Sequence, residues 1–430
     1  MPVPPGIGWE VSITAFRFRI PILIAAAMAI NYIDRQTLPV AIHAIQRDIP
    51  LSNVAYSQLQ AAFLIAYAVS YAAGGRLLDS VGVRLGFLLM MLWWSLACAS
   101  QALATGLGTL AAARLLLGLG EGAAFPGAAK AVAEWFPARE RSTAMGMIHA
   151  GTSVGSMIAP PVVASAILLS NWRWAFVLLG SLGLLWVIGW WRGYPSASLT
   201  EPAVRKPGPG TPGVRTSWVA LLKHPAVLGL LLCRFFFCDA AFYFCLFWLP
   251  KYLFDARGFD TRSVGYFAWI PYLAHAMGGL SGGWFSSRFM RWGYSLNFSR
   301  KAVIGFSALL APALFYVTRS PVSVAIVLLS IAYFGQAASS AIIMVLPADL
   351  FPAGNVGTVS GMIGFGGALG GSAFGFVVAY LLDHGFGYPT VFALVSTFPL
   401  LAFFTILATI PAIGGLDRKT PQALACGSMS

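Results

Sequence analysis

Residues 107–134 read LGTLAAARLLLGLGEGAAFPGAAKAVAE, an apolar run with Arg114 and Glu121 in its interior. A helix needs roughly 20 residues to cross the hydrocarbon core of a bilayer, and this run is long enough to do so. A charged side chain inside a membrane helix is costly and therefore faces a partner or a polar cavity. The stretch predicts a transmembrane helix that also carries chemistry.

Comparable apolar runs occur along the whole chain and predict an all-α polytopic membrane protein with twelve transmembrane helices in two six-helix pseudo-symmetric halves. Residues 194–219 separate the halves and are polar and proline-rich, which favours a cytoplasmic linker. We expect an N-terminal half over 1–193, a C-terminal half over 220–413 and a cytoplasmic tail over 414–430. The expected spans are 18–40, 55–78, 84–104, 107–134, 139–168, 172–193, 226–254, 260–290, 298–318, 321–349, 353–382 and 387–413.

The composition agrees with a membrane protein and excludes several other classes. Of the 430 residues, 58% are hydrophobic and 10% are charged, and the mean hydropathy is +0.77. Ordinary soluble enzymes, disordered chains and disulfide-stapled secreted domains have other compositions. The net charge of +13 comes from basic residues spread thinly between apolar runs, so we expect no nucleic-acid partner.

The basic residues of the predicted loops indicate the orientation of the chain. If the N-terminus is cytoplasmic, most loop Lys and Arg lie on the cytoplasmic side, including those around 84, 139–141 and 288–301. Cytoplasmic loops carry such an excess. We therefore expect both termini and the linker in the cytoplasm, and a multi-pass protein of the inner membrane.

An internal repeat relates the two halves. Residues 120–122 (GEG) and 134–138 (EWFPA) recur, after a shift of half the chain length, as 335–337 (GQA) and 349–353 (DLFPA). Chance similarity between apolar helices is the alternative. The acid-x-Phe-Pro-Ala turn that both halves share in register argues against chance. Parallel repeats of six helices are one architecture of secondary transporters.

A short basic loop resembles a known family signature. Gly75, Asp79, Gly82 and Arg84 lie between the second and third expected spans with the spacing of the cytoplasmic loop motif of the major facilitator superfamily. The resemblance implies a role for this motif in conformational change. The corresponding C-terminal stretch is degenerate, because Ser287 replaces the acid.

Further motifs resemble the anion:cation symporter family and its hexuronate and aldonate branch. They are NYIDR at 31–35, RLLLGLGEG with Phe-Pro at 114–126, FCLFWLPK at 244–251 and FAWIP at 267–271. The resemblance covers the chain from about Ile20 to Ile413. It implies that Arg35 binds a substrate carboxylate, that Asp34 and Glu121 carry protons, and that Arg114 pairs with the acid or the substrate. Tyr32 and Tyr67 match positions that hydrogen-bond substrate.

Independent reasoning from charge leads to a similar expectation. Arg114 and Glu121 are seven residues apart, so both lie on one helix face about 10 Å apart along the axis. Asp34 and Arg35 are adjacent and point about 100° apart, so they cannot face the same neighbour. Arginine stays charged and binds carboxylates, so protonation of the acids leaves a positive site for an anion. A buried structural ion pair is the alternative for each acid. Arg234 and Asp239 are further ionisable residues within the seventh expected span.

Several positions depart from the hexuronate branch where sugar hydroxyls would be read. His149 and Ser153 stand in place of two amides, and Ala276 replaces an acid beside His275. His149 is either a substrate contact or a core histidine. The further candidate substrate contacts are His149, Ser153, Tyr243, Trp248 and Gln336.

The leading hypothesis is a secondary active transporter that carries an organic anion, such as a sugar acid, together with protons by alternating access. The alternative is a symporter or exchanger for an aromatic or dicarboxylic acid, with sodium as the alternative coupling ion. A membrane enzyme or a receptor is the third hypothesis, but no metal-binding or nucleophilic motif supports an enzyme. We expect no metal, no cofactor other than protons as the coupling ion, lipid around the protein, and a monomer.

Overall fold

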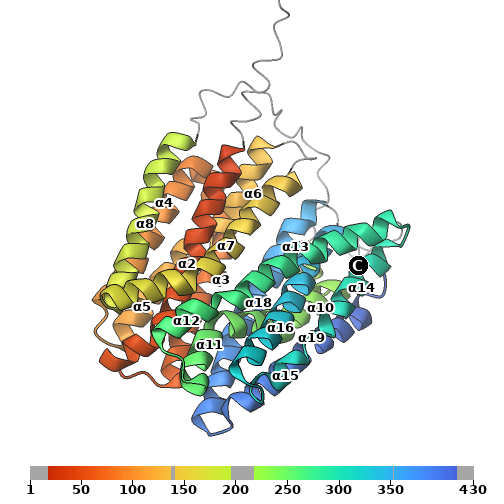
Figure 1. Cartoon of the computed structure of the whole chain (residues 1–430). Coiled ribbons are helices and arrows are strands. Elements are labelled where there is room, and N and C mark those ends of the chain that lie inside the picture. The colour runs from red at the N-terminus through yellow and green to blue at the C-terminus, as the bar shows by residue number, and fades with distance from the viewer. Residues whose placement is uncertain (1–17, 137–140, 195–216, 352, 414–430) are drawn as a thin grey trace, which may run out of the picture. The chain divides into compact units, whose positions relative to one another are not determined.

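The computed structural model describes residues 18–136, 141–194, 217–351 and 353–413, and within these ranges its regular elements are helices (Figure 1). The expected tail and most of the expected linker lie outside the described residues. The backbone divides into two compact units. Unit 1 comprises Met1–Gly208 and Leu246–Trp269, and unit 2 comprises Pro209–Cys245 and Ile270–Ser430.

Each of the twelve expected spans corresponds to a helix or to consecutive helices of the described chain. The first six are α2 (Arg19–Asp48), α3 (Asn53–Val81), α4 (Val83–Ser100) with η1 (Gln101–Leu103), α5 (Leu107–Glu121) with α6 (Ala124–Trp135), α7 (Arg141–Leu169) and α8 (Trp172–Gly193).

After the short α9 (Trp218–Leu222), the seventh span joins α10 (Pro225–Cys233), the π-helical turn η4 (Arg234–Cys238) and α11 (Asp239–Arg257). The remaining spans are α12 (Thr261–Phe267) with α13 (Trp269–Arg291), α14 (Leu296–Ala308) with α15 (Ala313–Val317), α16 (Val322–Ile343) with α17 (Leu346–Leu350), α18 (Ala353–Asp383) and α19 (Gly387–Thr409).

Eight of the described helical stretches are long and apolar enough to cross a membrane by length and composition alone. Two of the remaining expected spans, the fourth and the eighth, are divided between two helices. In the fourth, for instance, the helix is broken into α5 and α6, each of them shorter than a bilayer is thick. The first, α2, carries Asp34 and Arg35 in its interior. The expected spans outside these eight include the two that hold Asp34, Arg35, Arg114 and Glu121, whereas the span with Arg234 and Asp239 is among the eight.

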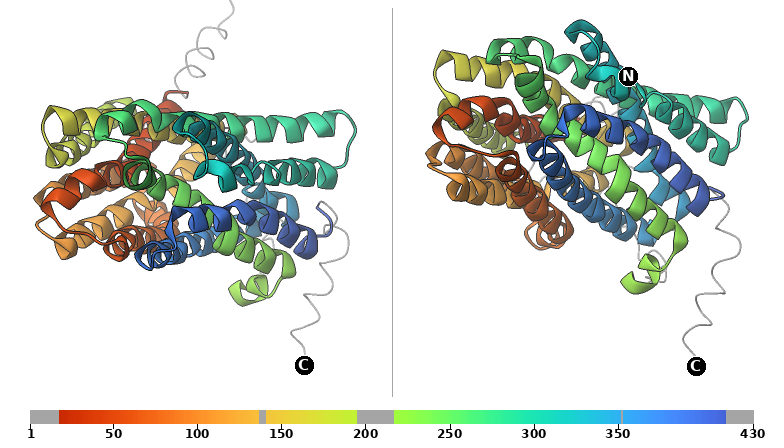
Figure 2. Two further views of the ribbon diagram at one scale, coloured as in Figure 1. Left: turned by 60° about the horizontal axis from the view of Figure 1, so that its bottom comes forward. Right: turned by 90° about the horizontal axis from the view of Figure 1, so that it is seen from below.

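In unit 1, α2 packs along α7 and α8, α3 packs along α5, and α4 packs on both α5 and α8 (Figures 1 and 2). Helix α7 approaches α2 closely at Gly151 and Gly155. A Cβ atom at either position would overlap the backbone of Ala25 or Ala29. Small residues permit such close helix packing in membranes. This contact fixes α2, and with it Asp34 and Arg35.

The break between α5 and α6 differs from the single helix expected over 107–134 and has a local cause. Pro126 has no backbone N–H and cannot donate to the carbonyl four residues earlier, at Gly122. The chain turns at Gly122 and Ala123 and resumes as α6. Glu121 is consequently the last residue of α5.

In unit 2, α10 packs on α18 and α19, and α14 packs on α16 and α19 (Figure 2). The π-helical turn η4 packs on α18, where a Cβ atom at Gly370 would overlap the backbone of Phe235. The apolar core of this unit includes Val227, Leu230 and Ile406, none of them measurably exposed.

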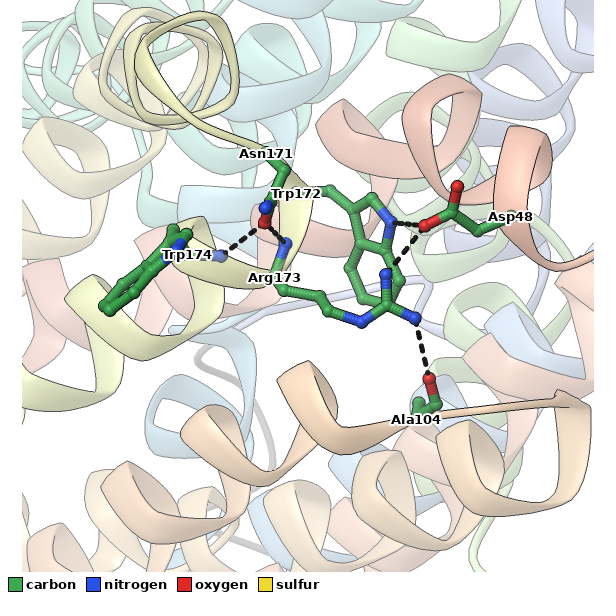
Figure 3. A network of polar contacts seen from close by, with 6 residues as sticks. All are labelled: Asp48, Ala104, Asn171, Trp172, Arg173 and Trp174. Atoms are coloured by element: carbon green, nitrogen blue, oxygen red, sulfur yellow. Dashed lines mark hydrogen bonds and ion pairs between the residues drawn. The ribbon is translucent and has the colours of Figure 1, made fainter.

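One end of unit 1 is held by a polar network around Asp48 (Figure 3). Trp172 Nε1 donates to Asp48 Oδ2 at 2.9 Å, and Arg173 donates to the same oxygen at 2.7 Å and to the carbonyl of Ala104 at 3.3 Å. Asn171 caps α8 by accepting from the backbone N–H groups of Arg173 and Trp174. The hydrogen bond from Trp172, and then the one from Arg173, hold the pKa of Asp48 below its ordinary value.

Candidate functional site

A buried ion pair lies at the centre of the candidate site in unit 1. Arg35 Nε on α2 donates to Glu121 Oε2 on α5 at 2.7 Å, and the two side chains are 2% and 0% exposed. Removing one partner of such a pair leaves an uncompensated buried charge. The pair can therefore respond to protonation of Glu121, or to an anion that competes for Arg35, more strongly than an exposed pair could.

Asp34, the neighbour of Arg35, faces another helix. Its Oδ1 accepts from the Cys98 thiol on α4 at 3.4 Å, and its side chain is wholly buried. Successive residues of a helix point about 100° apart, which explains why the adjacent acid and base meet different helices. The expectation that Asp34 and Arg35 face different neighbours is thus met by the geometry.

Arg114 lies on the same helix as Glu121 but has its own partner. Its Nη2 donates to Gln60 Oε1 on α3 at 2.6 Å, and its guanidinium carbon lies 4.5 Å from the centre of the Phe63 ring. The residue is completely buried. Arg114 is consequently a second buried cation near Glu121, held by a neutral amide.

Aromatic rings surround the Arg35 guanidinium. Its carbon lies 4.4 Å from the ring centre of Tyr67, 4.8 Å from that of Tyr32 and 5.4 Å from that of Phe63. Cation–π contacts of this kind stabilise a guanidinium without neutralising it. The two predicted tyrosines are therefore placed beside the predicted anion-binding arginine.

Three other candidate residues of unit 1 are described by their packing and exposure. His149 on α7 is exposed, and its ring lies tilted against that of Phe125 at 5.3 Å between centroids. Ser153, one turn further along α7, is half-buried. Trp248 is 2% exposed and packs edge to face on Tyr56 at 5.1 Å.

Unit 2 holds a second intramembrane ion pair and a neutral polar group. Arg234 donates to Asp239 at 2.7 and 3.1 Å, with side chains 15% and 12% exposed. Gln336 on α16 lies 3.1 Å from His275 Nε2 on α13 and donates to Ser340 at 3.1 Å.

The remaining candidate of unit 2, Tyr243 on α11, is 8% exposed, and its ring occupies the space that a Cβ atom at Gly371 on α18 would need.

The loop motif is described in part. Gly82 has φ +79°, a conformation that favours glycine, and it joins α3 to α4. Arg84 donates to the carbonyl of Trp191 at 3.0 Å and lies over its ring at 4.4 Å. The surroundings of Gly75 and the side chain of Asp79 lie outside the described residues.

Sequence reasoning missed two partners of the cluster, Gln60 and Cys98. Gln60 could have been noted as a polar residue inside an apolar span, whereas a buried cysteine ordinarily behaves as a small hydrophobe and gives no signal. Within the described part of the chain, no group of three or more His, Cys, Asp or Glu side chains could hold a metal ion.

Comparisons with known proteins place the chain in a family. The model of the Major Facilitator Superfamily matches residues 24–373. The hexuronate transporter of Escherichia coli (strain K12) is 32% identical over 93% of this chain and 96% of its own length. The D-galactonate transporter of Escherichia coli O6:H1 (strain CFT073) is 29% identical over 94% and 96%. The hexuronate transporter of Bacillus subtilis (strain 168) is 29% identical over 94% and 98%.

A solved structure shows the same fold. A bacterial homolog of the human lysosomal transporter Spinster, in an inward-facing and unoccupied conformation, superposes with a TM-score of 0.70 at 16% identity, over 92% of this chain and 95% of that one. The expected multi-pass all-α fold and the resemblance to sugar-acid transporters are both confirmed. This chain belongs to the major facilitator superfamily.

Proposed function

We propose that the protein is a secondary active transporter that moves an organic anion, a sugar acid such as a hexuronate or aldonate, together with protons. The observation that supports this most is the buried Arg35–Glu121 ion pair between α2 and α5. It combines a permanent cation with a titratable acid inside the membrane, which are the two groups that coupling an anion to a proton requires.

The coupling follows from charge balance. With Glu121 ionised, Arg35 is already neutralised, and a substrate carboxylate would compete with Glu121 for the guanidinium. Protonation of Glu121 removes that competitor and leaves one positive charge, which the substrate carboxylate then neutralises. Proton and anion therefore bind favourably together and unfavourably apart.

The neighbouring residues have supporting roles in this proposal. Asp34 is a second proton carrier, wholly buried beside the pair. Arg114, held by Gln60, either pairs with Glu121 or attracts the substrate. Tyr32 and Tyr67 flank Arg35 and offer hydroxyl groups to the substrate.

The names of the relatives and the packing of the aromatic residues favour a sugar acid over an aromatic acid. The similar curated proteins are named as transporters of hexuronate, galactonate and galacturonate. The aromatic side chains that an aromatic substrate would need are largely packed away: Trp248, Tyr272 and Tyr243 are 2%, 3% and 8% exposed.

The protein acts, in this proposal, as a monomer in the inner membrane, with both termini in the cytoplasm, where most loop Lys and Arg residues then lie. Substrate access alternates between the two sides of the membrane. Protons, rather than sodium ions, drive uptake.

Uptake into proteoliposomes tests the proposal. Vesicles with an alkaline lumen are given labelled glucuronate, galacturonate, galactonate, a dicarboxylic acid and an aromatic acid, each at equal sodium concentration on both sides. We expect accumulation of a sugar acid that collapses when a protonophore is added. Accumulation driven by a sodium gradient at constant pH, or restricted to aromatic acids, would contradict the proposal.

A further inference from the structure

The Cys98 thiol lies between two acceptors that come from different helices. Its sulfur is 3.4 Å from Asp34 Oδ1 on α2 and 3.9 Å from the carbonyl oxygen of Phe176 on α8. All three residues are completely buried. A thiol has a single proton to donate, so it can serve one acceptor at a time.

Asp34 has few other polar contacts. Its second oxygen, Oδ2, is buried and takes no hydrogen bond from the described residues. An ionised carboxylate accepts hydrogen bonds only, whereas a protonated one has its own proton to donate. The thiol is therefore useful to Asp34 when the acid is ionised and can be released when the acid is neutral.

The charged surroundings of Asp34 come from three helices. Glu121 on α5 and Arg35 on α2 act on it through space, and Cys98 contacts it from α4. Arg114 on α5 acts in turn on the thiol. On the other helices packed against α2, His149, Lys130 and Arg173 make their described contacts elsewhere.

We propose that Cys98 is a positioning residue for Asp34: its thiol donates to the Asp34 carboxylate when the acid is ionised and turns to the Phe176 carbonyl when the acid is protonated. No bond to sulfur breaks; the proton that arrives on Asp34 comes from solvent, and the S–H group only rotates. Because Phe176 belongs to α8, each protonation of Asp34 exchanges an α4–α2 contact for an α4–α8 contact. This inference rests on the proposed proton coupling and names how one of its acids is held.

Infrared difference spectroscopy of the full-length protein in nanodiscs tests the contact directly. On acidification, we expect the S–H stretching band to move as Asp34 becomes protonated. The S–H band that shifts with pH should be absent in Cys98→Ala. It should be present but independent of pH in Asp34→Asn, and it should shift as in the wild type in Cys233→Ala. Cys233 is the matched control, since it is also completely buried but contacts a thiol and a carbonyl. An S–H band that ignores pH overturns the proposal.

The pH profile of proton-driven uptake supplies a second readout. Losing a donor to the ionised acid favours the protonated form, so in Cys98→Ala the pH of half-maximal uptake should rise by about half a unit. In Cys98→Ser, a stronger donor should move it in the opposite direction, and Cys233→Ala should leave it unchanged. A purely structural thiol would lower the amount of folded protein without moving the profile, and equal profiles in all variants overturn the proposal.

The two readouts separate this inference from the proposed function. If wild-type uptake does not depend on a proton gradient, the proposed coupling fails, while a moving S–H band would still establish the donor exchange. If uptake is proton-driven and both the band and the profile ignore Cys98, the coupling stands and the positioning role is wrong.

Discussion

Each unit contains an arginine–acid pair that comes from the predicted intramembrane residues, and these two pairs are built differently. In unit 1, Arg35 and Glu121 come from separate helices and are 2% and 0% exposed. In unit 2, Arg234 and Asp239 are five residues apart on one helical stretch and are 15% and 12% exposed. Only the first pair joins two helices, so protonation of its acid changes a tertiary contact. The second pair lies within one helical stretch.

Both acids nevertheless stand beside an irregular turn. Glu121 is the last residue before the break between α5 and α6, and Asp239 is the first residue after the π-helical turn η4. In a π-helical turn the residues five apart are brought together, which explains the contact between Arg234 and Asp239. Irregular backbone within a membrane helix is tolerated where protein surrounds it and is frequent at functional sites.

The largest expected difference between the pairs concerns proton coupling. Glu121→Gln keeps the size of the side chain but cannot titrate, so we expect proton-driven accumulation to fall to background while substrate exchange persists. The matched change, Asp239→Asn, should leave accumulation measurable, because its pair is local and partly exposed. Uptake and exchange in proteoliposomes measure both. Full accumulation by Glu121→Gln would refute the coupling role.

The second largest expected effect is the difference between Arg35 and Arg234 in their contribution to the affinity for the anion. Arg35→Ala removes a charge-assisted contact to the substrate carboxylate, and we expect the affinity to fall roughly 10- to 100-fold. Arg234→Ala should change it by much less. Isothermal titration at acidic pH, where Glu121 does not compete, measures the binding. Equal losses in both variants would show that the two pairs contribute alike and would end the distinction drawn between them.

Helix packing is a property in which the units should agree. A Cβ atom would overlap backbone at Gly151 in unit 1 and at Gly370 in unit 2, but would meet open space at Gly146 and Gly361. Alanine at the first two positions should destabilise by about 1–3 kcal/mol. At the other two positions it should be neutral or stabilising by up to about 1 kcal/mol. Thermal unfolding in detergent measures this, and destabilisation at the open sites would contradict the packing described.

The transmembrane spans were predictable because an apolar run of membrane length usually forms a transmembrane helix. The contacts between side chains within the site were not predictable in this way. Spacing alone places Asp34 and Arg35 on different faces. It does not say that Glu121 meets Arg35 rather than Arg114, because that depends on how α2, α3 and α5 pack. The neutral partners Gln60 and Cys98 have no charge pattern to reveal them.

Local backbone features were predictable only in part. Pro126 is visible in the sequence, yet a proline in a membrane helix either kinks or breaks it, and here α5 ends before it. The π-helical turn at Arg234–Cys238 left no signal in an unbroken apolar run. The assignment of Leu246–Trp269 to unit 1 also reflects contacts between residues distant in sequence, such as the hydrogen bond from the Tyr56 hydroxyl to the Phe247 carbonyl.

The smallest expected effect concerns an exposed ion pair of unit 1, which completes the comparison with the buried one. Trp172 and Arg173 hold the pKa of Asp48 below its unfolded value, so this contact stabilises the fold above the ordinary range near pH 4 and loses its effect as pH falls through the lower folded pKa. Asp48→Asn should therefore lower the Tm slightly at neutral pH and not at about pH 3. Asp260→Asn is the control, since Asp260 caps α12 through Ser263 and asparagine caps a helix equally well. If Asp48→Asn lowered the Tm as much as a substitution in the buried Arg35–Glu121 pair does, the exposed network rather than that pair would hold the helices of unit 1 together.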